Sequence, residues 1–211
     1  MYEFGYQLSG VSVPPGTNLL ITGPPLTGKR RLALETLASG TEDGDGGILL
    51  TTRDSADRIL TVYEQLADPT TTPVTVIDAV TKHMGQSVEE SERVSYAASP
   101  TEMTEIGIKF SEIVESYDEQ PGIDRTRVVV DSLTTLLLYA NLQTVFRFMH
   151  VFTSRVENAD AVGVYTIEST AHGCETMNTL TQLFDGVVRV DRDGEFTVEL
   201  DADPAQIDPS D

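Results

Sequence analysis

Residues 23–30, Gly-Pro-Pro-Leu-Thr-Gly-Lys-Arg, have the types and spacing of a loop that binds phosphate groups. In such a loop the glycines let backbone N–H groups turn inward, the following helix N-terminus adds positive potential, and the lysine reaches the terminal phosphates. An ordinary strand–turn–helix connection is the alternative. The apolar run Asn18–Thr22 before the loop and the helical pattern after it favour nucleotide binding. The predicted nucleotide-binding residues are Gly23, Pro24, Pro25, Leu26, Thr27, Gly28, Lys29 and Arg30.

Arg30 stands where such loops usually carry serine or threonine. The hydroxyl of that residue is a ligand of Mg²⁺, and an arginine cannot hold a metal ion, although it can contact a phosphate directly. The exchange should therefore affect hydrolysis more than it affects binding. We expect ATP or ADP as the ligand and leave the presence of Mg²⁺ open.

A second element is the apolar run Arg127–Leu133, which contains an acid. In nucleoside triphosphatases the acid at the end of this strand holds the metal ion, usually through water. Asp131 is therefore the predicted metal-binding residue, with capping of the next turn as the alternative. The lysine loop about a hundred residues upstream favours the role in the site.

Two further candidates follow other apolar runs. Asp54 comes after Gly47–Thr52, where a carboxylate could orient the attacking water, so it is the candidate catalytic residue. Capping of the following helix by Asp54 or Ser55 is the favoured alternative. The stretch from Thr166-Ile167-Glu168 through His172 lies at the end of the run Ala161–Ile167, and its polar groups could sense the terminal phosphate. His172 is either part of that sensor or simply solvated.

The apolar runs alternate with helical patterns, which predicts βαβ units and a mainly parallel sheet. Asp193-Gly194 joins the last two runs and is a hairpin signal. The predicted fold class is α/β: a mainly parallel sheet sandwiched by helices, with a C-terminal antiparallel hairpin. Strands are expected at Asn18–Thr22, Gly47–Thr52, Pro73–Val80, Arg127–Leu133, Ala161–Ile167, Asp185–Asp191 and Glu195–Asp201.

Amphipathic helices are predicted over Ser55–Ala67, from Ser99 onward, and around Val145–Val156. Ser99–Glu102 has the order of an N-cap, a first-turn proline and a capping-box glutamate. The apolar stripes of these helices should face the core. The acidic, glycine-rich stretch Gly40–Gly46 is expected to be a surface loop.

The composition is that of one globular domain of 211 residues, 39% of them hydrophobic. We expect a single domain over residues 1–201 and a disordered acidic tail over residues 202–211. No run is long enough for a membrane span, and Met1–Glu3 does not open a signal peptide. The single cysteine, Cys174, makes a disulfide scaffold or a zinc finger very improbable.

The chain carries 34 acidic and 14 basic residues, a net charge of −20. Such a surface repels nucleic acid at ordinary salt. It is also typical of proteins that work in concentrated salt, where charges are screened within about 3 Å at 1 M. The acids are spread along the chain, which favours the second interpretation. We therefore expect a halophilic, cytoplasmic protein whose net charge says little about its partners. We expect neither a membrane nor a nucleic acid as partner, the latter because the sequence has no obvious basic, aromatic-rich loop.

The order of these elements resembles the RecA-like ATPases, and within them the KaiC-like branch. Val13–Thr17 (VPPGT) resembles that branch's entry to the first strand, and residues 127–134 (RVVVDSLT) resemble its metal-holding strand. The resemblance spans residues 11–201. More narrowly, GPPLTGK, SPTEMTEIGIK (residues 99–109) and LFDGVVRV are similar to small "HTR-like" proteins of halophilic archaea. The resemblance to the KaiC-like branch implies that Gly23–Lys29 cradle the phosphates and that Asp131 holds the metal.

The branch's paired catalytic glutamates fall on Arg53 and Asp54, so the first is lost and the second is shortened. With Arg30, this implies weak or absent hydrolysis and a regulatory or signalling module that acts on a protein partner. An active Mg-dependent ATPase with Asp54 as the base is one alternative, and a RecA-like DNA-repair accessory is another. RecA-like proteins often assemble, so self-association is also possible.

Overall fold

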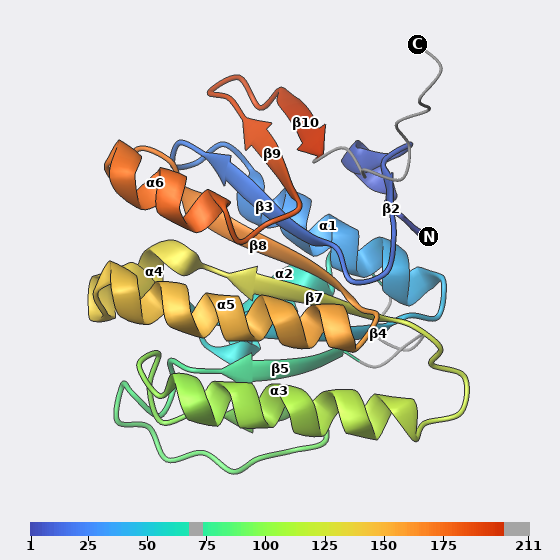
Figure 1. Cartoon of the computed structure of the whole chain (residues 1–211). Helices are drawn as coiled ribbons and strands as arrows, with labels where there is room; N and C mark the ends of the chain where they lie inside the picture. The colour runs from blue at the N-terminus through green and yellow to red at the C-terminus, as the bar shows by residue number, and fades with distance from the viewer. Residues whose placement is uncertain (68–73, 201–211) are drawn as a thin grey trace.

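The computed structural model describes residues 1–67 and 74–200; Pro73 and the expected tail lie outside these ranges. Within them, eight strands form one sheet in the order β10-β9-β3-β8-β7-β4-β5-β6 (Figure 1). The pairs are parallel except for the hairpin of β9 and β10, so the predicted fold class is confirmed. The strands are β3 (Asn18–Gly23), β4 (Gly46–Thr51), β5 (Val74–Asp78), β6 (Val94–Tyr96), β7 (Thr126–Asp131), β8 (Val162–Glu168), β9 (Gly186–Val190) and β10 (Phe196–Leu200).

Helices cover both faces of this sheet (Figure 1). Leu19 and Ile21 of β3 pack in the core under α1 and α2, while Leu20 between them packs in the opposite core under the other helices. Both faces are buried, which explains why the strands are nearly all apolar. The helices are α1 (Lys29–Glu42), α2 (Ala56–Tyr63), α3 (Met103–Asp118), α4 (Leu133–Tyr139), α5 (Leu142–Asn158) and α6 (Cys174–Thr181).

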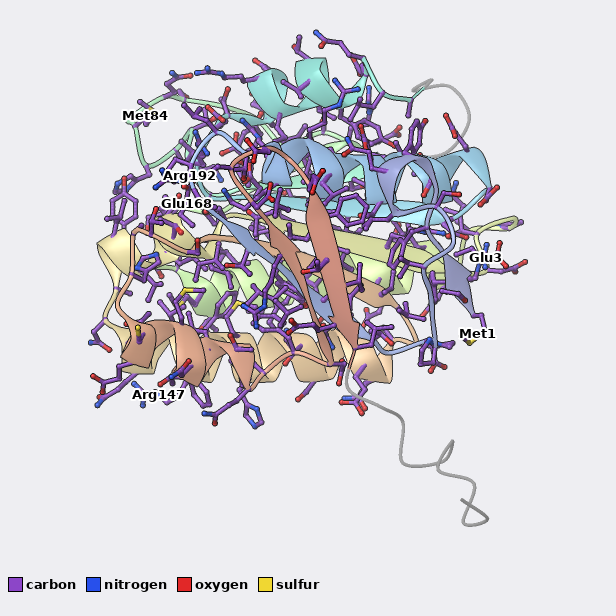
Figure 2. All side chains as sticks on the ribbon, turned by 90° about the horizontal axis from the view of Figure 1, so that it is seen from above. Met1, Glu3, Met84, Arg147, Glu168 and Arg192 are labelled. Atoms are coloured by element: carbon purple, nitrogen blue, oxygen red, sulfur yellow. The ribbon has the colours of Figure 1, made fainter. Side chains whose placement is uncertain are left out.

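The parallel register brings the ends of several strands to one edge of the sheet. Gly23 of β3 is the register partner of Glu168 of β8, and Thr51 of β4 is the partner of both Asp131 and Asp78. Seen from above, Glu168 lies at one end of the sheet and the chain start at the other (Figure 2). Ligands of open α/β sheets bind at this carboxyl edge.

The expectation of a surface loop over residues 40–46 is right only for its middle. Glu42 and Asp43 are exposed, but helix α1 continues to Glu42, and Gly40 lies buried in its last turn. Asp45 is also buried and accepts hydrogen bonds from Arg125 (2.8 Å) and Arg127 (2.7 Å). A Cβ at position 40 would overlap the Arg127 side chain. Long-range ion pairing, which local composition does not reveal, turns Asp45 inward.

The expected start of α3 is wrong. The helix begins at Met103, and its N-cap residue, Glu102, makes no side-chain capping bond. Ser99 instead forms a turn in which its Oγ accepts a hydrogen bond from the Thr101 N–H (3.2 Å). The apolar stripe of α3 nevertheless faces the core as predicted.

Several short elements were not predicted. The apolar run expected as one strand over Arg127–Leu133 divides at Asp131, and α4 starts at Leu133. The others are β6, α6, the two-stranded sheet of β1 (Tyr2–Glu3) with β2 (Ser12–Val13), and the 3-10 helix η1 (Tyr6–Leu8). None of the described helices is both long and apolar enough to cross a membrane.

Candidate functional site

The loop between β3 and α1 is shaped by its glycines. A Cβ at Gly23 would overlap the carbonyl oxygen of Val190 in the neighbouring strand β9, so only glycine fits at this position. Gly28 has a φ of 87°, in the left-handed region, and is the N-cap residue of α1. It provides no side-chain capping bond, so the N-terminus of α1 keeps its capacity to stabilise an anion.

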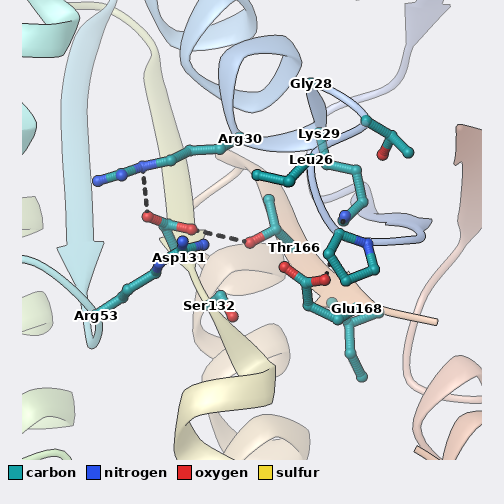
Figure 3. Close-up of a pocket in the computed structure, with 12 residues that line it drawn as sticks. Leu26, Gly28, Lys29, Arg30, Arg53, Asp131, Ser132, Thr166 and Glu168 are labelled. Carbon is teal, nitrogen blue, oxygen red and sulfur yellow. Dashed lines mark hydrogen bonds and ion pairs between the residues drawn. The ribbon is translucent and has the colours of Figure 1, made fainter. Parts of the chain in front are cut away.

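A cavity of about 210 Å³ opens beneath this loop. Residues 25–30 form one wall, and the ends of β7 and β8 together with Arg53 form the rest (Figure 3). Six of the eight predicted binding residues therefore line one cavity; Gly23 and Pro24 do not line it. Leu26, at the tip of the loop, is fully exposed.

Lys29 is buried at the first position of α1. Its Nζ donates a hydrogen bond to the carbonyl oxygen of Pro24 (2.5 Å) and lies 3.8 Å from Oε2 of Glu168. Burial lowers the pKa of the Lys29 ammonium, and the Glu168 carboxylate opposes that effect. The ammonium thus has two partners within the protein, of which Glu168 lines the cavity.

Arg30 joins two carboxylates. Its Nη1 lies 2.7 Å from Oδ2 of Asp54. Its Nε lies 2.9 Å from Oδ2 of Asp131, the contact drawn in Figure 3. The second contact is close but poorly aligned for a hydrogen bond. Within the described residues, Nε and Nη2 of Arg30 and Oδ2 of Asp131 are buried without hydrogen-bond partners. Because Nε and Oδ2 already face each other, it is Nη2 of Arg30 that retains hydrogen-bonding capacity for a ligand.

Asp131 lies at the end of β7, with only 2% of its side chain exposed. Burial raises the pKa of its carboxyl group, whereas the nearby Arg30 and Arg53 guanidinium groups act in the opposite direction. Thr166 of β8 donates a hydrogen bond to Oδ1 (3.2 Å). The peptide bond between Asp131 and Ser132 is cis. The structure thus brings Asp131 and the lysine loop into one site.

Residues 16–190 match a protein family of unknown function, DUF7504. The chain belongs to this family. A solved structure, the KaiC-like protein PH0186 of the hyperthermophilic archaeon Pyrococcus horikoshii OT3, is similar to it with a TM-score of 0.60. The two are 15% identical, over 89% of this chain and 78% of that one. At such identity the likeness establishes a shared fold. No curated protein has a matching sequence.

The residues of this DUF7504 chain do not fit the magnesium ion that the RecA-like fold implies. Position 30 has no hydroxyl, and Asp131 already faces a guanidinium. At about 4 Å and an effective dielectric constant near 20, repulsion between Mg²⁺ and Arg30 is about 8 kcal/mol, which cancels the attraction to a water-bridged Asp131. Among the described residues, no three acidic, histidine or cysteine side chains gather to hold a metal. The magnesium role of Asp131 stays a prediction.

Asp54 does not line the cavity; its carboxylate is held by Arg30 and by Arg58 (3.3 Å). The expected capping of α2 by Asp54 or Ser55 is half right. Ser55 is the N-cap residue but makes no side-chain bond. The carboxylate of Asp78 caps α2 instead, by accepting a hydrogen bond from the Ala56 N–H in the first turn of the helix (2.7 Å). The catalytic role of Asp54 remains untested.

His172 also lies outside the cavity lining. It is half-buried, with Nε2 3.1 Å from Oγ1 of Thr134, the same hydroxyl that accepts a hydrogen bond from the Glu168 N–H (2.9 Å). Burial lowers the pKa of the imidazole, while the Glu168 carboxylate opposes the shift. His172 is therefore a structural neighbour of the β8 end of this DUF7504 site.

Two residues of the cavity were missed as binding candidates, Arg53 and Ser132. Both follow directly after apolar strands, so the carboxyl-edge rule could have found them. The Ser132 N–H donates to Oγ1 of Thr52 (2.9 Å), and that hydroxyl donates to the Ser132 carbonyl (2.8 Å). This pair of bonds ties the chain after β4 to the chain after β7 and fixes the cavity floor.

Proposed function

We propose that this chain binds ATP or ADP through residues 23–29. The observation that supports this most strongly is the buried lysine at the N-terminus of α1, facing a cavity at the carboxyl edge of the sheet. The lysine ammonium, the open helix N-terminus and the unpartnered Nη2 of Arg30 all favour an anion. A phosphate chain is the ligand that suits this set.

We further propose that the protein is a regulatory or signalling module in which nucleotide state controls contact with a protein partner. Weak or absent hydrolysis is supported by the charges around the cavity. Arg53 lines it where the KaiC-like branch carries a glutamate, and the Asp54 carboxylate is held by two arginines. A carboxylate held in this way is a poor base for activating water.

The test is titration of a fluorescent ATP analogue in molar KCl, with unlabelled ATP and ADP as competitors. We expect saturable, competable binding that is lost in Lys29→Ala. Arg31→Ala is the matched control, because Arg31 lies two residues further along α1 with its side chain 66% exposed and paired with Glu35. Equal binding by the wild type and Lys29→Ala would refute the proposal. ATP turnover at ordinary enzyme rates, lost on Asp131→Asn, would replace the regulatory role with a catalytic one.

A further inference from the structure

One guanidinium lies between two carboxylates at the place where a nucleotide's phosphates would meet the end of β7. Arg30 contacts Asp54 through Nη1 and Asp131 through Nε, and it is itself only 24% exposed. These contacts join α1, the segment after β4 and the end of β7. They are part of the fold and need no ligand.

We propose that Arg30 serves as the built-in cation of this site, so that the chain binds its nucleotide as the free polyphosphate and Mg²⁺ opposes binding. The inference rests on the proposed function, that residues 23–29 bind a nucleotide. It adds the form of the ligand, the residue that selects it and the direction of the metal's effect.

The charges facing the cavity suit an uncomplexed phosphate chain. Three cations line it, Lys29, Arg30 and Arg53, against two carboxylates, Asp131 and Glu168, so cationic groups are in excess. Nη2 of Arg30 is a buried donor with no hydrogen-bond partner among the described residues. A guanidinium offers several donors in a planar fork that matches phosphate oxygens. Because Nη1 and Nε already lie against carboxylates, the fork is fixed in place before a phosphate arrives.

Magnesium works against the same arrangement. A bound Mg²⁺ occupies phosphate oxygens that the arginine fork would otherwise contact, and it places a divalent charge beside a guanidinium. The group that would attract it, Asp131, already faces the Arg30 guanidinium, with Nε 2.9 Å from its Oδ2. Excess Mg²⁺ also removes free nucleotide from solution.

The deciding substitution is Arg30→Thr, which removes the cation, frees Asp131 and supplies the missing hydroxyl. In the wild type, excess Mg²⁺ should weaken nucleotide affinity relative to EDTA by roughly fivefold or more. In Arg30→Thr, affinity in EDTA should fall roughly tenfold to a hundredfold, the loss of a charge-assisted hydrogen bond. Mg²⁺ should then strengthen binding, so the sign of the metal effect reverses. Arg31→Thr, the same exchange one residue along the helix, should behave as the wild type.

A second readout does not depend on nucleotide. Electron paramagnetic resonance of Mn²⁺ added to the nucleotide-free protein counts the metal ions that the protein binds. Comparison with Asp131→Asn distinguishes Mn²⁺ bound at this site from Mn²⁺ bound by carboxylates elsewhere on the acidic surface. We expect the wild type and Asp131→Asn to bind the same amount. Arg30→Thr should gain a site that is lost in the double variant Arg30→Thr/Asp131→Asn. Arg30→Lys, which keeps a cation, covers the case in which Arg30→Thr does not fold, and it should gain no site.

The outcomes separate the inference from the proposed function. Nucleotide binding by the wild type that Mg²⁺ strengthens, to the same extent in Arg30→Thr, would overturn the inference and leave the function standing. Mn²⁺ binding by the wild type that Asp131→Asn removes would overturn it too. Absence of nucleotide binding in both EDTA and Mg²⁺ would overturn the proposed function. The inference that the ligand is a free polyphosphate would then be overturned as well.

Discussion

Replacing Gly40 by alanine tests whether the end of α1 is packed as the structure has it. Alanine exceeds glycine in helix propensity by about 1 kcal/mol, so the exchange would stabilise an unobstructed helix. Here the new methyl group would lie 2.8 Å from Cζ of Arg127 and closer still to its Nε. Arg127 is 2% exposed, and its guanidinium donates to Asp45 (2.7 Å) and to the carbonyl oxygens of Glu3 (2.9 Å) and Thr36 (3.1 Å).

The guanidinium must therefore move and loosen its pairing with buried Asp45. Breaking a buried ion pair costs about 3–5 kcal/mol, so after the propensity gain we expect Gly40→Ala to lower the free energy of unfolding by about 2–4 kcal/mol. Urea denaturation followed by circular dichroism measures this difference. Gly173→Ala is the control, because a Cβ at Gly173 meets nothing within 4 Å. A Gly40→Ala protein as stable as the wild type, or more stable, would refute the packing.

Three further results are expected. Asp78→Ala should lower the free energy of unfolding by roughly 2–4 kcal/mol in urea, because the buried carboxylate accepts from the N–H groups of Ala56, Val80 and Thr81; an unchanged midpoint would contradict this. Burial raises the pKa of Tyr117 from 10.0 to about 12, so the unfolded chain loses this proton first and stability should fall between these pH values, by roughly 3 kcal/mol in all. Urea midpoints across this range should fall less steeply in Tyr117→Phe, and equal slopes would show that the hydroxyl ionises freely. Asp54→Ala should weaken nucleotide binding by loosening Arg30, but at saturating ATP it should leave any slow phosphate release unchanged in a malachite-green assay; a large drop at saturation would make Asp54 a catalytic base.

The central strands could be predicted because their burial on both faces leaves a direct mark on the sequence. Asn18–Thr22 and Ala161–Ile167 correspond closely to β3 and β8, and Asp193-Gly194 marks the hairpin of β9 and β10. The same signal failed at Arg127–Leu133. An apolar strand passes there directly into an apolar helix. Hydrophobicity alone does not show where the two-residue repeat of the strand gives way to the 3.6-residue repeat of the helix.

The candidate site was predictable in its residue types and not in its pairings. The loop and Asp131 follow from local pattern, but the contact of Arg30 with two acids depends on β4 lying beside β7. The pattern of residue types does not show which strands are neighbours in the sheet. The capping of α2 by Asp78 was missed for the same reason, since β5 must lie next to β4 before the two segments meet.

Nucleotide binding by the loop before α1 is tested most directly by a crystal structure of the protein grown with ADP. We expect phosphates against the N-terminus of α1, with Nζ of Lys29 released from the Pro24 carbonyl and in contact with a phosphate oxygen. Nucleotide bound elsewhere on the surface, or a Lys29 that keeps its bond to Pro24 while ADP occupies another site, would contradict it.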